Sequence, residues 1–422
     1  MTLPDSEDCS SDSPPRKRAK LDDTLNGNGT KRQLGLLSCC DDILLEIFSY
    51  LRPNDLLSLS QCCQRIQQVV FDRTLWTSVD LRPVCLSHME IEKYIKFLLP
   101  CTNFIATNGP LSLLDILCNS LSDSQNSEHT QEPEECTSSD SSSQASSSTS
   151  EIVPSFTGKL LEKIKEAAPN LVTLILENHI LDSRQLSWEQ FPSGLEYLSL
   201  HRCQVSNLQP SKSFFFGVDK YLPRLKVLDV SDCTWFESHS FLALSKCPAL
   251  EELRLSNNKI NDFVPYISLG TRFGFRALTV VDFRRTFISD REISCLNKTP
   301  QLKEMYLEAP SADGRTLITD MAITSFGATL AEWNAMGFFV LLMEHNDAFM
   351  PSPLQVVELC NYVTVTDTSL RHCAQCLKGL KLLNVKGTSC TERGVITFKN
   401  ARPDVEIISS FDLEVGSSND NT

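Results

Sequence analysis

Apolar residues near the N-terminus follow a helical spacing in two short blocks. The blocks are Ile43, Leu44, Ile47, Phe48 and Leu51, and then Leu56, Leu57, Leu59, Cys62, Cys63, Ile66, Val69 and Val70. Intervals of three and four residues place apolar side chains on one face of a helix. We expect two or three short amphipathic helices within residues 34–80. Such a small unit buries little of its own apolar surface, which predicts a docking module for a partner protein.

A second pattern, Leu-x-x-Leu-x-Leu with apolar substitutes, recurs from residue 169 onward. Its first positions are Leu171, Leu195, Leu225, Leu250, Leu278, Leu302, Leu354 and Leu380. Successive positions are 24, 30, 25, 28, 24, 52 and 26 residues apart, and the long interval is twice the last one. A period near 26 residues is typical of a leucine-rich-repeat solenoid. We therefore predict an α/β fold in which a curved parallel sheet is concave and the helices are convex.

The residues between the buried leucines face the concave side of such a sheet, because side chains alternate along a strand. The predicted concave residues are Glu177, Tyr197, His201, Asp229, Arg254, Asp282, Arg284, Glu304, Tyr306, Glu308, Glu358 and Lys386. Tyr and Arg are over-represented among residues that dominate binding energy, so the predicted anchor for a target protein is Arg254, Arg284 and Tyr306. Acidic neighbours at Asp229, Asp282, Glu304 and Glu308 favour a target with some positive charge.

Two stretches interrupt the repeats. Residues 119–154 are rich in Ser, Asp and Glu, and their composition predicts disorder. We expect them to act as a spacer, and acidophilic phosphorylation of their serines is the alternative. Residues 331–353 contain an apolar octet and two prolines, and removing them restores a normal period between Leu302 and Leu354, which predicts an insertion. The solenoid then covers residues 155–412, after divergent first repeats at 81–118, and residues 413–422 form a disordered tail.

Residues 1–33 are polar, without apolar periodicity, and are predicted to be disordered. They contain a basic cluster, defined as Arg16, Lys17, Arg18 and Lys20, directly after two prolines. Proline favours extended backbone in the residue before it, and an importin groove requires an extended basic segment. The cluster therefore predicts nuclear import and a protein shared between nucleus and cytoplasm; a solvated run of charge is the alternative.

Composition narrows the function classes. The net charge of −14 argues against a nucleic-acid binder, which needs clustered Lys and Arg. The sequence has neither an apolar run of the roughly 20 residues that span a bilayer nor a signal-peptide core, so we expect a soluble intracellular protein. Seventeen cysteines scattered through a long chain are expected to be reduced thiols.

Candidate chemistry is sparse. The only dense group of metal-binding residue types is His372, Cys373 and Cys376, and no second pair stands at zinc-site spacing. No Gly-rich phosphate loop and no set of nucleophile and base is evident. We predict no metal, no cofactor and no enzymatic activity.

The helical module resembles an F-box, through Asp41–Leu51 (DDILLEIFSYL), Asp55-Leu56, Cys62-Cys63 and Leu75-Trp76. Cys39-Cys40 stand where Leu-Pro is usual, and Ile66 stands where Trp is common. The resemblance implies binding to the Skp-type adaptor and, through it, to a cullin and a RING subunit. The implied adaptor-binding residues are Ile43, Leu44, Ile47, Phe48, Leu51, Leu56, Leu57, Leu75 and Trp76.

The module and the repeats together resemble the F-box proteins with leucine-rich repeats, whose cysteine-containing subtype is matched around Cys233 and Cys360. This resemblance implies a substrate-recognition subunit of a Skp–cullin–F-box ubiquitin ligase that promotes ubiquitylation and proteasomal degradation. Two other classes stay open. One is a nuclear leucine-rich-repeat scaffold without a role in ubiquitylation, and the other is a chromatin or nucleic-acid regulator that depends on the basic cluster.

Overall fold

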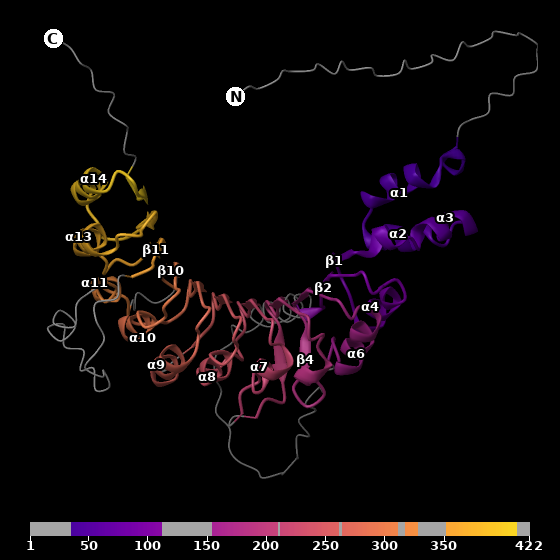
Figure 1. The fold of residues 1–422 in the computed structure, drawn as a ribbon, viewed down its shortest axis with the longest axis horizontal. Coiled ribbons are helices and arrows are strands. Elements are labelled where there is room, and N and C mark those ends of the chain that lie inside the picture. Colours follow the sequence, from indigo (N-terminus) through magenta and orange to yellow (C-terminus); the bar gives the residue numbers. More distant parts are fainter. Residues whose placement is uncertain are drawn as a thin grey trace, which may run out of the picture.

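The protein is described here by a computed structural model, which covers residues 35–111, 154–209, 212–260, 264–310, 317–327 and 352–411. A helical module leads into a curved solenoid (Figure 1). Four predicted features lie outside the described residues: the N-terminal tail with its basic cluster, the Ser-rich segment except its last residue, the insertion at 331–353 except its last two residues, and the tail at 413–422.

The helical module consists of short helices, as predicted. They are η1 (Leu36–Ser38), α1 (Asp41–Ser49), α2 (Pro53–Leu59), α3 (Gln64–Val70) and η2 (Arg73–Trp76). Pro53 occupies the first turn of α2, where a missing N–H costs nothing and the fixed φ suits the helix. Arg65 on α3 ties η1 to the module, since its guanidinium donates to the carbonyls of Leu37 and Cys39 and pairs with Asp41 at 3.2 Å.

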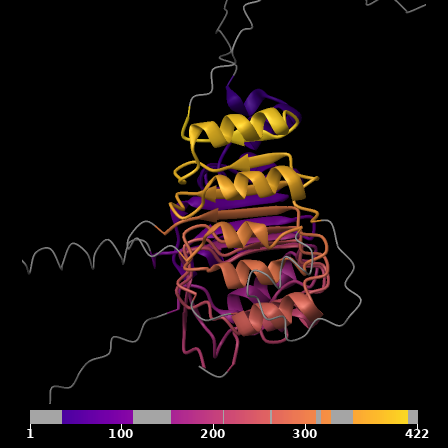
Figure 2. The ribbon, with the colours of Figure 1, turned by 90° about the vertical axis from the view of Figure 1, so that its left-hand side faces the viewer.

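The solenoid is built on an 11-stranded parallel sheet whose strands follow one another in chain order. The strands are β1 (Ser78–Cys85), β2 (Phe104–Asn108), β3 (Thr173–Glu177), β5 (Tyr197–Ser199), β7 (Val227–Asp229), β8 (Glu252–Arg254), β9 (Val280–Asp282), β10 (Glu304–Glu308), β11 (Val356–Cys360), β12 (Leu382–Asn384) and β13 (Glu406–Ile408). A second sheet pairs β4 (Ile180–Asp182) with β6 (Gln204–Ser206). Figure 2 shows the coils stacked one on another.

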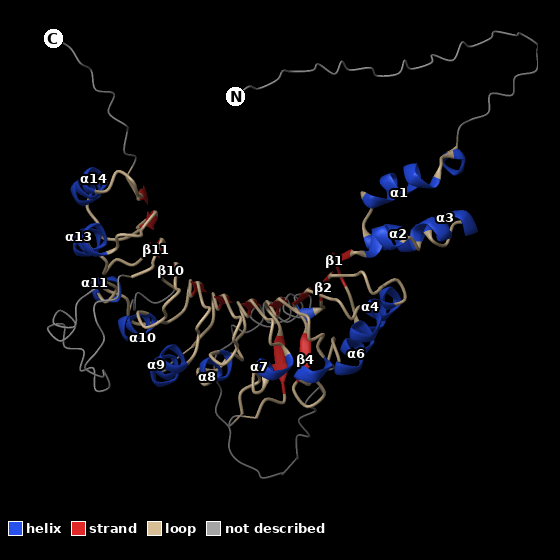
Figure 3. Ribbon diagram, viewed as in Figure 1, coloured by secondary structure: helices blue, strands red, loops and turns tan. Residues whose placement is uncertain are grey.

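Helices return along the outer side of the coils while the long sheet lines the inner side (Figure 3). They are α4 (His88–Ile95), α6 (Gly158–Ala167), η3 (Trp188–Gln190), α7 (Val218–Tyr221), α8 (Ser240–Leu244), α9 (Val264–Phe273), α10 (Asp290–Leu296), α11 (Asp320–Thr324), α13 (Asp367–Cys376) and α14 (Glu392–Ala401). The central apolar residue of each repeat block, such as Leu198, Leu228 or Met305, is buried between the two layers. This confirms the predicted solenoid.

The long interval between Leu302 and Leu354 falls within a single coil. Strand β10 pairs directly with β11, with Glu304 opposite Val356 and Glu308 opposite Cys360. Helix α11 belongs to this coil and packs against α13. The direct pairing is what extra residues within one coil require, because a further complete repeat would place its own strand between β10 and β11.

Aspartates at the helix starts connect the last coils. Asp290 accepts hydrogen bonds from the backbone N–H and the hydroxyl of Thr319, which caps α11. Asp320 accepts the equivalent pair from Thr366, and Asp367 accepts it from Thr391. Each aspartate is the first residue of its helix. We call this series the Asp–Thr ladder; it fixes each helix to the next one along the solenoid.

A buried histidine joins the two sides of the segment 112–153. His179 is fully buried, with Nε2 3.0 Å from Oγ1 of Thr107 and Nδ1 3.1 Å from Oγ of Ser155. Burial lowers the pKa of His179 to about 3. The ring is therefore neutral at physiological pH and uses both nitrogens to hold chain segments that lie far apart in sequence.

Candidate functional site

Helix α1 has two apolar faces, of which one is open to solvent. Ile43, Ile47 and Tyr50 are 50%, 40% and 80% exposed, and their spacing places them on the same side of the helix. We call these three residues the α1 apolar face. Leu36 and Leu37, in η1, are also exposed. Large apolar side chains that gather on one face of a small module are typical of a docking surface.

Four residues predicted to contact the adaptor are instead buried in the core of the chain itself. Leu44, Phe48, Leu56 and Trp76 are each no more than 2% exposed. The indole of Trp76 donates to the carbonyl of Val70 at 2.6 Å and stacks on Phe97 with ring centroids 4.5 Å apart. We therefore withdraw these four residues from the adaptor surface, since a covered side chain stabilises its own fold and cannot also contact a partner. Leu51, Leu57 and Leu75 are half-buried against the same core.

The concave face carries two separate groups of Arg and Tyr. In the first, Arg254 pairs with Glu252 at 2.6 Å and donates to the hydroxyl of Tyr197 at 3.3 Å. Its guanidinium lies 6.0 Å from the centre of the Tyr197 ring. Tyr197 is on β5 and Arg254 on β8, so the arginine reaches across β7. We call these three residues the first Arg–Tyr cluster.

The second Arg–Tyr cluster comprises Asp282, Arg284, Glu304 and Tyr306. Arg284 pairs with buried Asp282 at 2.6 Å and lies 5.7 Å from the centre of the Tyr306 ring. The hydroxyl of Tyr306 donates to Glu304 at 2.7 Å. Burial and this hydrogen bond raise the pKa of Tyr306. The pKa of Arg284 is also raised, mainly because its guanidinium donates hydrogen bonds to the carboxylate of Asp282. Both side chains are therefore held in fixed positions on the concave face.

The structure brings only part of the predicted anchor together. Arg284 lies against Tyr306, whereas Arg254 contacts Tyr197, which the sequence placed on this face without giving it a binding role. Glu308 is held by Arg285 at 3.1 Å and by Asn361 at 3.3 Å. Asp229 accepts a hydrogen bond from the backbone N–H of Ser231, and neither Asp229 nor Glu358 forms an ion pair within the described residues.

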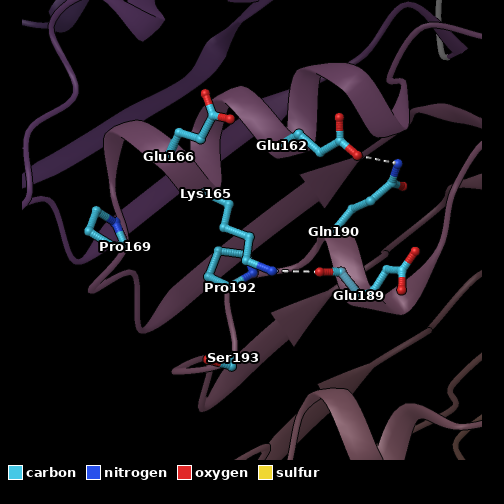
Figure 4. Close-up of a pocket in the computed structure, with 8 residues that line it drawn as sticks. All are labelled: Glu162, Lys165, Glu166, Pro169, Glu189, Gln190, Pro192 and Ser193. Carbon is cyan, nitrogen blue, oxygen red and sulfur yellow. Dashed lines mark hydrogen bonds between the residues drawn. The ribbon is translucent and has the colours of Figure 1, made fainter.

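A groove on the outer side of the solenoid is lined by residues of α6, of η3 and of the loops that follow them (Figure 4). It is lined by Glu162, Lys165, Glu166, Pro169, Glu189, Gln190, Pro192 and Ser193. Lys165 donates to the carbonyl of Glu189 at 2.5 Å, and Gln190 donates to Glu162 at 3.1 Å. The groove contains carboxylates and the ammonium group of Lys165, which is already hydrogen-bonded to a backbone carbonyl. No nucleophile contacts a base among these lining residues, so the groove offers no arrangement for catalysis.

Within the dense Cys/His group, Cys373 is buried in the core, whereas His372 and Cys376 are half-buried. His372 Nε2 lies 2.7 Å from the carbonyl of Phe326, and burial raises the pKa of Cys373 to about 12. A thiol with such a pKa is protonated and unreactive at neutral pH. Across the described ranges, no three His, Cys, Asp or Glu side chains are placed to hold a metal ion.

Among the same residues, no helix is long and apolar enough to cross a bilayer.

Comparisons with known proteins agree with the helical module and the repeats. An F-box-like family model matches residues 41–82. The chain is 29% identical to F-box/LRR-repeat protein 12 of Homo sapiens over 176 residues, which are 40% of this chain and 41% of that protein. The protein of the same name from Mus musculus is 27% identical over 220 residues, covering 51% and 54% of the two chains. The chain contains an F-box-like domain and is homologous, at modest identity, to proteins of which it spans about half the length.

Solved structures provide more distant likenesses. The structure of the TLR13–ssRNA13 complex has 17% sequence identity to this chain and a TM-score of 0.38. The match covers 62% of this chain and 32% of the chain in that structure. An internalin from Listeria monocytogenes has 13% sequence identity to this chain and a TM-score of 0.30. The match covers 60% of this chain and 51% of the internalin chain. Likenesses with such low TM-scores carry no argument about this chain.

Proposed function

We propose that this chain is the substrate-recognition subunit of a Skp–cullin–F-box ubiquitin ligase. In this role the F-box-like module binds the Skp-type adaptor, which connects the chain to a cullin and a RING subunit. The concave face of the solenoid binds a target protein, which is then ubiquitylated and degraded. The observation that carries the proposal is the exposed α1 apolar face within the residues that match the F-box-like model.

The adaptor would cover Ile43 and Ile47. Both side chains are about half exposed, and removing their apolar surface from water contributes roughly 1 kcal/mol or more for each at about 25 cal/mol per Å². Leu44 and Phe48 fill the core on the opposite side of the same helix and hold the face in place. The half-buried Leu51, Leu57 and Leu75 would complete the contact at its edges.

The target would lie on the concave face, over the two Arg–Tyr clusters. The proposed contacts are Arg254, Arg284 and Tyr306, with Asp229, Glu304 and Glu308 beside them. Asp282 is also predicted from the sequence to contact the target, but its side chain is buried beneath Arg284, so it would position that arginine instead. The chain itself would break or form no bond. It would raise the effective concentration of target lysines near a charged ubiquitin-conjugating enzyme, and positioning of this kind accelerates a reaction without catalytic groups.

Co-purification with the Skp-type adaptor tests the proposal. The variant Ile43→Asp/Ile47→Asp places two charges on the α1 apolar face and should abolish co-purification, because an unpaired charge is costly to bury. Ile396→Asp is the matched control, since Ile396 lies on α14 and is 43% exposed. The control should bind normally. Full adaptor binding by the double variant would contradict the proposal and favour a scaffold without a role in ubiquitylation.

A further inference from the structure

We infer that the concave face recognises an extended, positively charged segment of the target, lying across β7 to β11. This inference rests on the proposed function only in taking the concave face as the target-binding surface. It is drawn from the sheet register, from the charges that remain unpaired on this face, and from the spacing of the strands.

The register gives the face a mixed apolar and acidic floor. The residues aligned across successive strands are Tyr197, Val227, Glu252, Val280, Glu304 and Val356. All six are half-exposed. From Val227 to Val356, valines therefore alternate with carboxylates along the solenoid, and Tyr197 lies next to Val227 at the start of the row. No described part of the chain covers this sheet face (Figure 1). The apolar positions fit the aliphatic stems of long side chains, and the carboxylates between them fit the charged ends of those side chains.

The acidic groups outnumber the basic ones between β7 and β11. The carboxylates are Asp229, Glu252, Asp282, Glu304, Glu308 and Glu358, and the guanidinium groups are Arg254, Arg284 and Arg285. Each guanidinium is already paired, with Glu252, Asp282 and Glu308 respectively. A target segment therefore meets bound cations and open carboxylates, an arrangement that attracts positive charge and repels negative charge.

Asp229 and Glu358 are the carboxylates best placed to hold such a segment. They lie on β7 and β11, in the same register row as Arg254, Asp282 and Tyr306. Four strand spacings separate them, about 19 Å at roughly 4.8 Å for each spacing. An extended peptide advances about 3.3 Å per residue, so about six residues bridge the two carboxylates. The second Arg–Tyr cluster lies between the two carboxylates, and the first extends from β8 past Asp229 to β5. Both clusters would hold the bound segment from the side.

Direct binding of a labelled peptide tests the inference on the full chain without any adaptor. The probe is a fluorescent peptide of alternating lysine and threonine, about eight residues long so that it exceeds the span between the two carboxylates. The variant Asp229→Asn/Glu358→Gln removes both open carboxylates and keeps the acceptor for the Ser231 N–H. At constant salt, fluorescence anisotropy should show affinity for the probe reduced by about tenfold or more.

The matched control removes the same charge from the outer side of the solenoid. Glu166→Gln/Glu189→Gln lies in the groove of Figure 4, where both side chains are exposed. This variant should keep its affinity to within about twofold, because the removed charges are distant from the concave face and screened by salt. Equal losses in both double variants would show attraction to net charge alone and overturn the inference, as would no loss in the concave variant.

A third variant distinguishes a target segment from the basic cluster of the chain itself. If residues 16–20 occupied the concave face, replacing the four basic side chains by Ala would free it and increase probe affinity by about tenfold or more. Unchanged probe affinity supports a target segment as the occupant of the concave face. An increase in probe affinity would overturn the inference, because the chain's own basic cluster would then occupy that face. Adaptor co-purification is scored separately, so a chain that binds the adaptor and not the probe contradicts this inference and leaves the ligase role standing.

Discussion

The Asp–Thr ladder gives a quantitative prediction about the stability of the last coils. Asp320 accepts four hydrogen bonds, from the backbone N–H groups and hydroxyls of Thr366 and Ser369. Asp367 accepts two, from the backbone N–H and hydroxyl of Thr391. Both are half-buried and both are the first residue of a helix, so replacement by Ala changes helix propensity and the helix-dipole interaction equally. The difference between the two variants therefore isolates the hydrogen bonds.

Hydrogen bonds to a carboxylate contribute about 1.5 kcal/mol each at the lower end of their range, and half-burial favours that lower end. Because neighbouring bonds are not additive, we expect Asp320→Ala to reduce the free energy of unfolding by about 3 to 4 kcal/mol. Asp367→Ala should cost about half as much. Asp290→Ala, which also loses two bonds, should match Asp367→Ala.

Urea-induced unfolding followed by circular dichroism measures the cost, and hydrogen exchange of α11, α13 and α14 locates it. Coils of a solenoid contact only their neighbours, so the loss of protection should be concentrated in these three helices. Equal destabilisation by Asp320→Ala and Asp367→Ala, or a cost for Asp320→Ala below about 1 kcal/mol, would refute the reasoning that the ladder bonds connect the coils.

Two further predictions concern pH and location. The unfolded chain binds a proton at His179 near pH 6.5 and the folded chain only near pH 3, so the free energy of unfolding should fall as pH falls through this window. At pH 5 the free energy of unfolding should be about 2 kcal/mol lower because of His179. If the free energies of unfolding of wild type and His179→Gln differed by the same amount at every pH, this prediction would be contradicted. Replacing the basic cluster by Ala should shift the protein toward the cytoplasm in fluorescence images, whereas unchanged nuclear accumulation would identify the cluster as a solvated run of charge.

The repeat strands could be predicted because each carries a fixed apolar spacing. Blocks such as Leu225/Leu228 and Leu250/Leu253 recur at a period near 26 residues, and the structure pairs their strands in parallel. Strand β13 and the small sheet of β4 and β6 could not be predicted, because each strand has only three residues and no complete leucine block. Three residues are too few for alternation to differ from chance.

The candidate site was harder to predict than the fold. Ile43, Leu44, Ile47 and Phe48 form one apolar run in sequence, yet one pair faces solvent and the other faces the core. A run at helical spacing does not show which face is covered when neighbouring helices pack from one side only. Likewise, the contact between Arg254 and Tyr197 joins residues 57 positions apart, and it depends on how far a side chain reaches across the strand between them.

The central claim is that one chain connects an adaptor and a target, and ubiquitylation in a reconstituted Skp–cullin–F-box ligase tests it most directly. The target is a protein captured by wild-type chain under proteasome inhibition. Wild-type chain should support transfer of ubiquitin to it, Ile43→Asp/Ile47→Asp should retain the target without transfer, and Ile396→Asp should behave as wild type. Equal ubiquitylation by wild-type chain and by Ile43→Asp/Ile47→Asp would contradict the claim.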